Sequence, residues 1–554
     1  MLRDLFVAIS LSNLCFINAW RALLIPSSDF YYYHQKTLPP IVEYLSLVLL
    51  VVALGLLFFT GIRIIRGSRN TRLNNWARII FILILSVPVY GLLTQLDNSF
   101  VLRWLTRISG DGVTARRLIF SVPLAVSSFL TIIAFFKAKA ATRLAISLLL
   151  IIAPLVIITF SQAVLLAVKY RSSDKTAPLI ASKNGTKHPR ILWMVFDELD
   201  FRVAFAERPN GVKLPEIDRL ANESLFASNA YPPAGETLLS LPALISGKLI
   251  SEAHREGPDK LIIKYGDDQP AVSWGTQPNI FSQARAEGFN TALFGWYHPY
   301  CRIIGNDLTQ CAWQGLMPVA EINRLLRGDN SAQSTWNCFV DSVFEHVRTA
   351  ALTIPFGYLI FRPAAIDFAD VLRKDDLLYL DNTLQRTIEA ANNKELGLIL
   401  THWPIPHPPN IFDRKTHQIS TAPNHSYLDN LELADETLGK VRKAIEEKGN
   451  WDDMVILVSS DHWWRPSWKK QLVWTSEDEK TMKNDLDRRV PFILKMPGTG
   501  NQEIRYDAPF NTVLTHDLLL AILNGEVSDT KAAANWLDQH RSIARSPYDE
   551  RSYR

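Results

Sequence analysis

A hydroxyl at the start of a predicted helix has the setting for nucleophilic chemistry. Thr237 follows a turn, Tyr231–Gly235, whose two prolines and glycine exclude a helix. The pattern after Thr237 predicts a helix that ends at Gly247. The positive end of a helix dipole, with its free N–H groups, favours both an alkoxide and an incoming phosphate. Thr237 could equally be an ordinary N-cap, whose side chain accepts a backbone N–H.

Carboxylates and imidazoles lie at the carboxyl ends of three short apolar runs. They are Asp197 and Glu198 after Ile191–Phe196, His402 after Leu396–Leu400, and Asp461 with His462 after Met454–Val458. Each has an ordinary explanation, because acids after strands often cap helices and Ser459–His462 could be a polar turn. Taken together, oxygen and nitrogen donors of this kind form catalytic zinc or manganese sites. A metal there would lower the pKa of the Thr237 hydroxyl and polarise a phosphoryl oxygen.

The elements that would position these side chains alternate between strands and helices. Further buried strands are predicted at Thr291–Trp296 and Val490–Lys495, because continuous apolar runs suit a mainly parallel sheet. Helical patterns lie between the runs, at Leu214–Asn229, Asn279–Glu287, Leu377–Asn392 and Tyr427–Lys448. This alternation predicts a layered α/β fold, in which ligands gather at the carboxyl ends of the strands. The candidate residues should therefore meet at one sheet edge, near Thr237.

The first 168 residues have a different character from the rest of the chain. The overall charge of +4 and the charged fraction of 21% average two unlike halves. Five apolar runs are long enough to predict about five membrane-spanning helices. They are Leu5–Ile25, Tyr44–Ile62, Ile79–Leu96, Leu118–Phe136 and Leu144–Val168. The first run could instead be a signal peptide, but no small-residue cleavage site follows it. We predict a transmembrane domain at 1–168, a linker at 169–190, a catalytic domain at 191–530 and a polar tail at 531–554.

Loop charge predicts the orientation of the membrane half. Two loops are basic, with Arg63, Arg66, Arg69, Arg72 and Arg78 in the first and Lys137, Lys139 and Arg143 in the second. Basic loops stay in the cytoplasm, so the chain after Lys169 should lie outside. One loop opposes this assignment, because Arg103, Arg107, Arg116 and Arg117 fall on the predicted outer side. We interpret Phe100–Arg107 as an interfacial amphipathic segment whose arginines meet lipid phosphates. In an oxidising compartment Cys301 and Cys311 would be expected to pair.

Five segments, in order, resemble motifs of the sulfatases and their relatives in the alkaline phosphatase superfamily. They are Leu214–Ser224, Gly235–Pro242, Ser460–His462, Val490–Gly498 and His516–Leu518. The nucleophile segment and the Ser-Asp-His turn are similar to those of bacterial phosphoethanolamine transferases. A five-span anchor before the catalytic domain is also the layout of lipoteichoic-acid synthases. The resemblance covers about residues 190–524 and implies a sulfatase-like α/β domain behind a membrane anchor.

The resemblance also implies roles for single residues. It implies Thr237 as nucleophile and metal ligand, with Glu198, Asp461 and His462 as further ligands and Asp197 as an additional one. His407 falls where these families keep a histidine for the substrate phosphate, and His402 is the competing choice. Trp296 and Arg302 would bind substrate. The simpler interpretation is that Trp296 is a core residue and Arg302 a surface residue without a role in the site. The implied cofactor is a divalent metal, zinc first and manganese as the alternative.

Three departures limit the resemblance. Sulfatases that form formylglycine need Cys or Ser followed by x-Pro-x-Arg, whereas Thr237 is followed by Leu-Leu-Ser-Leu. This argues against sulfate-ester hydrolysis. After Asp461-His462 the relatives usually continue Gly-Glu, but this chain has Trp463-Trp464-Arg465. The multiple disulfides of the transferases are mostly missing as well, which leaves the acceptor open.

The resulting expectation is a multi-pass enzyme of the bacterial inner membrane with a periplasmic catalytic domain. It would transfer phosphoethanolamine or phosphoglycerol from a membrane phospholipid to an envelope glycan or glycolipid, through a covalent Thr237 intermediate. No nucleic-acid partner is expected. Two alternatives remain: a phosphodiester or sulfate-ester hydrolase that uses the same intermediate, and a catalytically silent module that binds a glycan or a partner protein.

Overall fold

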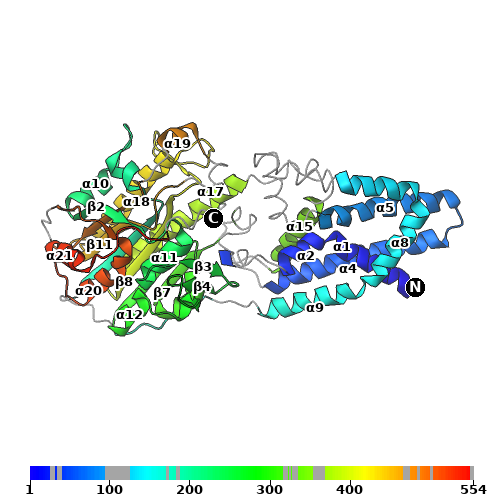
Figure 1. The fold of residues 1–554 in the computed structure, drawn as a ribbon, viewed down its shortest axis with the longest axis horizontal. Coiled ribbons are helices and arrows are strands. Elements are labelled where there is room, and N and C mark those ends of the chain that lie inside the picture. Colours follow the sequence, from blue (N-terminus) through cyan, green and yellow to red (C-terminus); the bar gives the residue numbers. More distant parts are fainter. Residues whose placement is uncertain are drawn as a thin grey trace. The chain divides into compact units, whose positions relative to one another are not determined.

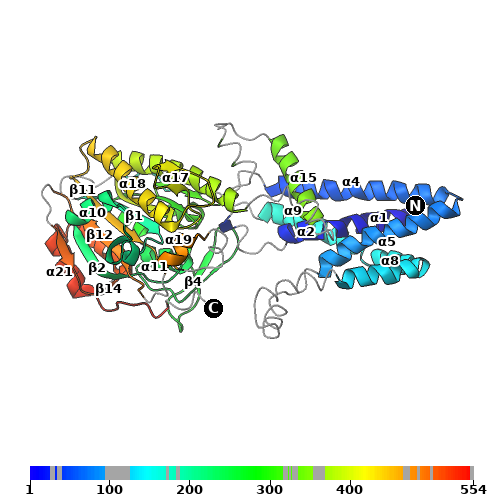
Figure 2. The same ribbon diagram turned by 90° about the horizontal axis from the view of Figure 1, so that it is seen from above.

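The computed structural model describes residues 1–24, 32–33, 40–93, 125–169, 174–181, 188–315, 322, 326, 335–352, 368–465, 474–482, 487–498 and 503–548. The chain forms two compact units (Figures 1 and 2). A helical unit contains Met1–Ser27, Lys36–Arg171 and Ser331–Ile366. An α/β unit contains Ser28–Gln35, Ser172–Asn330 and Asp367–Arg554.

The α/β unit is built on a sheet of nine strands within the described residues. The strand order is β13-β2-β12-β11-β1-β8-β6-β7, and β14 also pairs with β2. The strands are β1 (Arg190–Asp197), β2 (Leu225–Tyr231), β6 (Asn290–Trp296), β7 (Gln310–Gln314), β8 (Leu396–Pro406), β11 (Met454–Ser460), β12 (Val490–Lys495), β13 (Ile504–Tyr506) and β14 (Phe510–Asn511). The five neighbours from β11 to β7 run parallel, whereas β12 runs antiparallel to β11 and β2.

Helices cover both faces of this sheet, which confirms the predicted layered α/β fold (Figure 1). One layer contains α10 (Pro215–Asn222), α17 (Phe368–Asn392) and α18 (Tyr427–Glu446), and the other contains α11 (Thr237–Ser246), α12 (Ile280–Ala286) and α20 (Thr515–Leu523). The remaining elements are α13 (Tyr300–Ile303), α19 (Ser476–Thr481), α21 (Thr530–His540), a small sheet of β3 (Glu252–Arg255), β4 (Leu261–Lys264) and β5 (Val272–Ser273), and a hairpin of β9 (Phe412–Asp413) and β10 (Gln418–Ile419).

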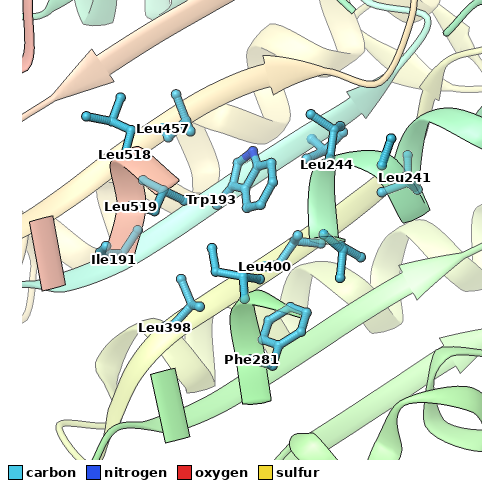
Figure 3. Close-up of a cluster of buried hydrophobic side chains, with 14 of the residues drawn as sticks. Ile191, Trp193, Leu241, Leu244, Phe281, Leu398, Leu400, Leu457, Leu518 and Leu519 are labelled. Atoms are coloured by element: carbon cyan, nitrogen blue, oxygen red, sulfur yellow. The ribbon is translucent and has the colours of Figure 1, made fainter. Parts of the chain in front are cut away.

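The apolar runs form central strands because both of their faces are covered. Trp193 and Ile191 of β1 point into the layer of α11, α12 and α20, where they meet Leu244 and Leu519 (Figure 3). Leu192, Met194 and Phe196 belong to the core on the opposite face. A continuous apolar strand is thus the expected result of burial on both sides.

One predicted helix was wrong in its second half. The pattern at Leu214–Asn229 suggested a single helix, but α10 ends at Asn222 and Leu225–Tyr231 is strand β2. β2 pairs with β12 on one side and with β13 and β14 on the other. These hydrogen bonds reach residues far along the chain, so local periodicity could not reveal them.

Within its described residues, the helical unit shows fewer clear spans than the five predicted, so the five-span bundle is not confirmed. Its helices are α1 (Leu2–Cys15), α2 (Ile17–Leu24), α4 (Pro40–Gly67), α5 (Thr71–Leu93), α8 (Ala138–Ile151), α9 (Pro154–Lys169) and α15 (Thr335–Leu352). Among the described residues, Ile41–Gly67 and Thr71–Tyr90 are long and apolar enough to cross a membrane. The bent pair α8 and α9 would be a third span if counted as one. The first predicted run is broken at Phe16, and the fourth is described only over Ala125–Phe136.

The division into units differs from the predicted one at two places. Helix α15 lies between β7 and α17 in the sequence, yet it packs on α4 in the helical unit, where His346 Nε2 lies 3.0 Å from the Glu43 carbonyl. Past residue 530, helix α21 still belongs to the α/β unit and buries Ala533 and Leu537. The predicted tail therefore begins with a packed helix. The arginine-rich loop at 103–117 lies outside the described residues.

Candidate metal centre and nucleophile

Three neighbouring parallel strands bring the predicted acids and imidazoles together. β1 lies between β8 and β11, with Val195 opposite His402 and Phe196 opposite Ser460. Asp197 therefore ends β1 beside His402, and Asp461 follows β11 at the same edge. β8 continues to Pro406, so His402 lies within a strand rather than after one.

The side chains of these residues form a compact, buried cluster. Ligand atoms of Asp197, His402 and Asp461 lie within 4.8 Å of one another, as do those of Asp197, Glu198 and His462. His402 Nε2 is 3.8 Å from Asp197 Oδ2 and 4.0 Å from Asp461 Oδ2. His462 Nε2 is 3.6 Å from an oxygen of each of these aspartates. All five side chains are at most 2% exposed.

Thr237 points into this cluster and is not the helix cap. The N-cap of α11 is Glu236, so Thr237 is the first residue inside the helix. Its Oγ1 lies 3.3 Å from Asp197 Oδ2 and 3.3 Å from His462 Nε2. As predicted, the helix ends at Gly247, which adopts a left-handed conformation with φ of 68°. The hydroxyl is thus directed at the candidate metal ligands and is available for chemistry.

Glu198 is held in a strained backbone conformation. Its φ is +63°, which is rare for a residue other than glycine and recurs at functional sites. Its N–H donates to Asp461 Oδ1 (3.3 Å), and its carbonyl accepts from Tyr427 Oη (2.7 Å). These bonds fix a carboxylate whose Oε1 lies 3.9 Å from His462 Nδ1.

The two histidines present a lone pair to the cluster. His402 Nδ1 lies 3.3 Å from the Trp296 carbonyl, and His462 Nδ1 lies 3.0 Å from the Trp463 carbonyl. A carbonyl oxygen only accepts, so Nδ1 carries the proton and Nε2 is left unprotonated in each neutral ring. Burial lowers the pKa of His402 to about 3, so its ring is neutral. Metal-binding histidines show this arrangement, with the second nitrogen donating to a carbonyl.

The residues present fit a divalent cation. His402 Nε2 and Asp461 Oδ2 are buried acceptors with no hydrogen-bond partner, and they face each other across the cluster. Burial raises the pKa of Asp461 to about 7, because removal from water penalises the charged carboxylate. Buried acceptors of one kind repel one another unless a cation or protons lie between them. Oxygen and imidazole ligands suit zinc or manganese.

The other predicted site residues have different surroundings. His407 is half-buried, donates its backbone N–H to the Asp197 carbonyl (3.1 Å) and lies with its ring 5.4 Å from that of Trp296. Trp296 therefore borders both His407 and His402, whose ring centroid is 6.0 Å away. Arg302 instead forms an ion pair with Asp174 (3.5 Å) and stacks on Trp313, so its described contacts are structural.

Several supporting residues escaped the reasoning from sequence. Ser240 Oγ donates to the Asp461 carbonyl (2.5 Å), which ties α11 to the metal turn. Tyr300 Oη lies 3.2 Å from His402 Nδ1, and His298 Nε2 lies 3.2 Å from the Thr237 carbonyl. Of these residues, Ser240 could have been predicted from the sequence, because it follows Thr237 by three residues and therefore lies on the same face of the helix.

Comparisons with known proteins find partial similarity to sulfatases and to a phosphonate monoester hydrolase. The curated N-acetylglucosamine-6-O-sulfatase of Bacteroides thetaiotaomicron is 29% identical over 117 residues, which cover 21% of this chain and 19% of that protein. The match thus spans about a fifth of the length of this relative. Similar solved structures include the PsFucS1 sulfatase of Pseudoalteromonas sp. (14% identity, TM-score 0.40, covering 61% of this chain and 68% of that one). Another is the phosphonate monoester hydrolase of Agrobacterium radiobacter (15% identity, TM-score 0.38, covering 61% of this chain and 74% of that one).

The family assignment comes from a model of the whole domain. The model described as Sulfatase matches residues 191–524, which is more than half of the chain and includes every member of the cluster. Enzymes of this family use a divalent metal, and the buried cluster could hold one. The chain belongs to the sulfatase family.

Proposed function

We propose that this enzyme transfers a phosphoethanolamine or phosphoglycerol head group from a membrane phospholipid to an envelope glycan or glycolipid. The observation that carries the proposal is the Thr237 hydroxyl, which lies 3.3 Å from both Asp197 and His462. A threonine at this position supplies an alcohol nucleophile, whereas formylglycine chemistry requires Cys or Ser.

The residues that would hold the metal are Asp197, Glu198, His402, Asp461, His462 and Thr237. Bound zinc, or manganese as the alternative, would lower the pKa of the Thr237 hydroxyl and withdraw electrons from a phosphoryl oxygen. Thr237 sits at the positive end of α11, which also favours a developing negative charge. Asp197 Oδ2, which accepts from Thr237 Oγ1, is placed to take the hydroxyl proton.

Two displacements complete the reaction. Thr237 Oγ1 forms a bond to phosphorus as the bond to the diacylglycerol oxygen breaks, and that oxygen takes up a proton. The acceptor hydroxyl then loses its proton, bonds to the same phosphorus and displaces Thr237. A covalent intermediate between the two steps predicts ping-pong kinetics. His407 and Trp296, which border the cluster, would contact the substrate.

The membrane assignment is part of the same proposal. We propose a multi-pass inner-membrane protein with about five spans and a periplasmic catalytic domain. Two long apolar helices support membrane attachment, and the disulfide that joins Cys301 and Cys311 supports an oxidising compartment. An anchored site would meet phospholipid head groups at high effective concentration.

Hydrolysis is the second candidate, and the sulfatase and phosphonate hydrolase relatives favour it. Water would then displace Thr237 in place of the acceptor. Sulfate-ester hydrolysis is the less supported form, because the formylglycine motif is missing. A catalytically silent binding module is disfavoured because all of the candidate ligands are present in one cluster.

Mass spectrometry of the Thr237 peptide tests the proposal. Full-length protein is isolated from native membranes, or incubated with zinc and vesicles of phosphatidylethanolamine and phosphatidylglycerol. A head-group mass on Thr237 would establish the nucleophile and name the donor. A bare Thr237 would contradict the proposal, and diacylglycerol release without any acceptor would favour the hydrolase.

Two variants serve as matched controls for this measurement. Thr237→Ala should retain the fold, because Glu236 is the cap of α11, and should lower turnover by about 1,000-fold or more. Thr237→Ser keeps a hydroxyl and should still form the adduct. If Thr237→Ala instead failed to fold, a structural role for this residue would regain support.

A further inference from the structure

A buried histidine connects the nucleophile segment to a tyrosine from the N-terminal part of the chain. His298 is fully buried, and its two ring nitrogens have different partners. Nε2 lies 3.2 Å from the Thr237 carbonyl, and Nδ1 lies 2.6 Å from Tyr32 Oη. Tyr32 is also fully buried and belongs to the α/β unit, although it lies between the first two apolar runs of the sequence.

The partners determine the direction of both hydrogen bonds. The Thr237 carbonyl can only accept, so His298 Nε2 carries the proton. In the tautomer that carries its proton on Nε2, Nδ1 has a lone pair, and this atom lies 2.6 Å from Tyr32 Oη. Tyr32 Oη must therefore donate to Nδ1. The result is a directed chain from Tyr32 through His298 to the backbone of Thr237.

Aromatic packing holds this chain in place. The His298 ring is packed against Tyr32, Trp274 and Tyr300, with centroids 5.5–5.9 Å apart and steep interplanar angles. The Arg255 guanidinium lies 4.5 Å from the ring centroid of Tyr33, next to Tyr32. These contacts leave little room for the imidazole to rotate, so the bond to Thr237 is kept in one geometry.

The bond from His298 acts at the first residue of α11. Residues before Thr237 form a turn, and the N-cap Glu236 makes no side-chain capping bond. Ser240 ties one side of the helix to the Asp461 carbonyl, and His298 holds the Thr237 carbonyl. With both in place, Thr237 Oγ1 is fixed between Asp197 and His462.

We propose that Tyr32 and His298 are positioning residues for the Thr237 nucleophile. Neither contacts the reacting atoms, and both act by fixing the backbone from which the Thr237 hydroxyl projects. The inference rests on the role of Thr237 in the proposed function. It makes the N-terminal part of the chain necessary for efficient catalysis, beyond any role in membrane attachment.

Kinetics of the full-length protein test this inference. Tyr32→Phe and His298→Leu should each lower kcat by about 10- to 100-fold, because small misplacements of a reacting group cost rates of this size. KM and the zinc content per chain should stay within twofold of wild type. His298→Gln, which retains an N–H able to reach the Thr237 carbonyl, should recover most of kcat.

The double variant Tyr32→Phe/His298→Leu tests whether Tyr32 acts on Thr237 through His298 or whether the two residues affect kcat independently. If Tyr32 acts through His298, the double variant should be no slower than His298→Leu alone. Tyr506→Phe is the matched control, because it removes one tyrosine hydrogen bond, to Asp538 at 2.9 Å, between elements that carry no site residue. Its kcat should equal that of wild type.

Defined results would overturn the inference. These are a kcat for Tyr32→Phe within twofold of wild type, multiplicative losses in the double variant, or a loss explained by reduced zinc content or melting temperature. Bis-p-nitrophenyl phosphate and p-nitrophenyl sulfate serve as substrates alongside lipid vesicles. If wild type hydrolyses one of them but never forms a head-group adduct, the proposed function fails while the kinetic comparison still decides the inference.

A measurement without turnover completes the test. In protein labelled with ¹⁵N-histidine, with His298→Gln used to assign the signal, the inference expects a neutral His298 ring with its proton on Nε2. A proton on Nδ1 would reverse the chain and overturn the inference, whatever the protein catalyses.

Discussion

The histidines near the site differ in what their second ring nitrogen does. His402 and His462 each place Nδ1 near a backbone carbonyl, which leaves Nε2 as a candidate metal ligand. His407 lies further out, with its ring beside Trp296. His402 and His407 were competing predictions for substrate binding. Their surroundings suggest instead that they have separate roles.

Substituting these two histidines should separate metal binding from substrate binding. His402→Ala removes a buried candidate ligand, so zinc affinity should fall by about 100-fold or more. Losing a residue that only supports a metal ligand already lowers metal affinity by about 10- to 100-fold, and losing a ligand itself should lower it further. His407→Ala should keep full zinc content and raise KM. Metal analysis of the purified variants, with steady-state kinetics, checks both. Full zinc content in His402→Ala would remove this residue from the ligand set.

At the scale of elements, α10 depends on a cap supplied by another helix. Its own N-cap, Leu214, makes no side-chain bond, and the Ile217 N–H donates instead to Asp435 Oδ1 of α18 (2.7 Å). Burial raises the pKa of Asp435 to about 7, although the hydrogen bond from the Ile217 N–H acts to lower it. The helix pair therefore contains a titrating group within the physiological range of pH.

This cap should make stability depend on pH. An acid whose pKa is higher in the folded chain binds more protons there than in the unfolded chain, between the two pKa values. The free energy of unfolding should therefore fall as pH rises from 3.8 to about 7, by at most about 1.4 kcal/mol per pH unit. Asp435→Asn keeps an acceptor and should remove this component of the slope. Denaturant unfolding across this range checks it, with Asp529→Asn at the exposed cap of α21 as the matched control.

The end of α11 should tolerate no side chain. Gly247 has φ of +68°, and an added Cβ would lie 2.7 Å from the His516 ring. Gly449, at φ of +69°, has nothing within 4 Å of that position. Gly449→Ala should lower the free energy of unfolding by about 1–2 kcal/mol, because alanine must adopt the left-handed conformation but meets no other atom. Gly247→Ala should lower it clearly more, because the added Cβ also collides with His516. Equal losses in free energy of unfolding would mean that His516 moves aside without cost.

At the scale of the whole molecule, metal binding and stability should be coupled. The cluster joins β1, β8, β11 and α11, so a bound cation would cross-link the centre of the α/β unit. Because an unfolded chain lacks this site, zinc at 100 times its Kd should stabilise the protein by about 2.7 kcal/mol. Chelation should lower the melting temperature, and added zinc should restore it. A melting temperature that changes neither on chelation nor on addition of zinc would contradict a structural contribution of the metal.

The sequence by itself determined the elements whose signals are local. Apolar runs such as Ile191–Phe196 predicted the central strands, because burial on both faces leaves a continuous pattern. The turn before Thr237 and the glycine at 247 predicted α11 nearly to the residue. Acids directly after strands predicted the cluster, because parallel strands end at a common edge.

Only the tertiary structure decided what depends on contacts between distant residues. It placed Glu236 rather than Thr237 at the cap, turned His402 toward the candidate ligands and made Leu225–Tyr231 a strand. Tyr32 and His298 are 266 residues apart, so no local pattern joins them. Periodicity and capping signals act over a few residues, whereas the positions of these side chains depend on which segments the fold brings together.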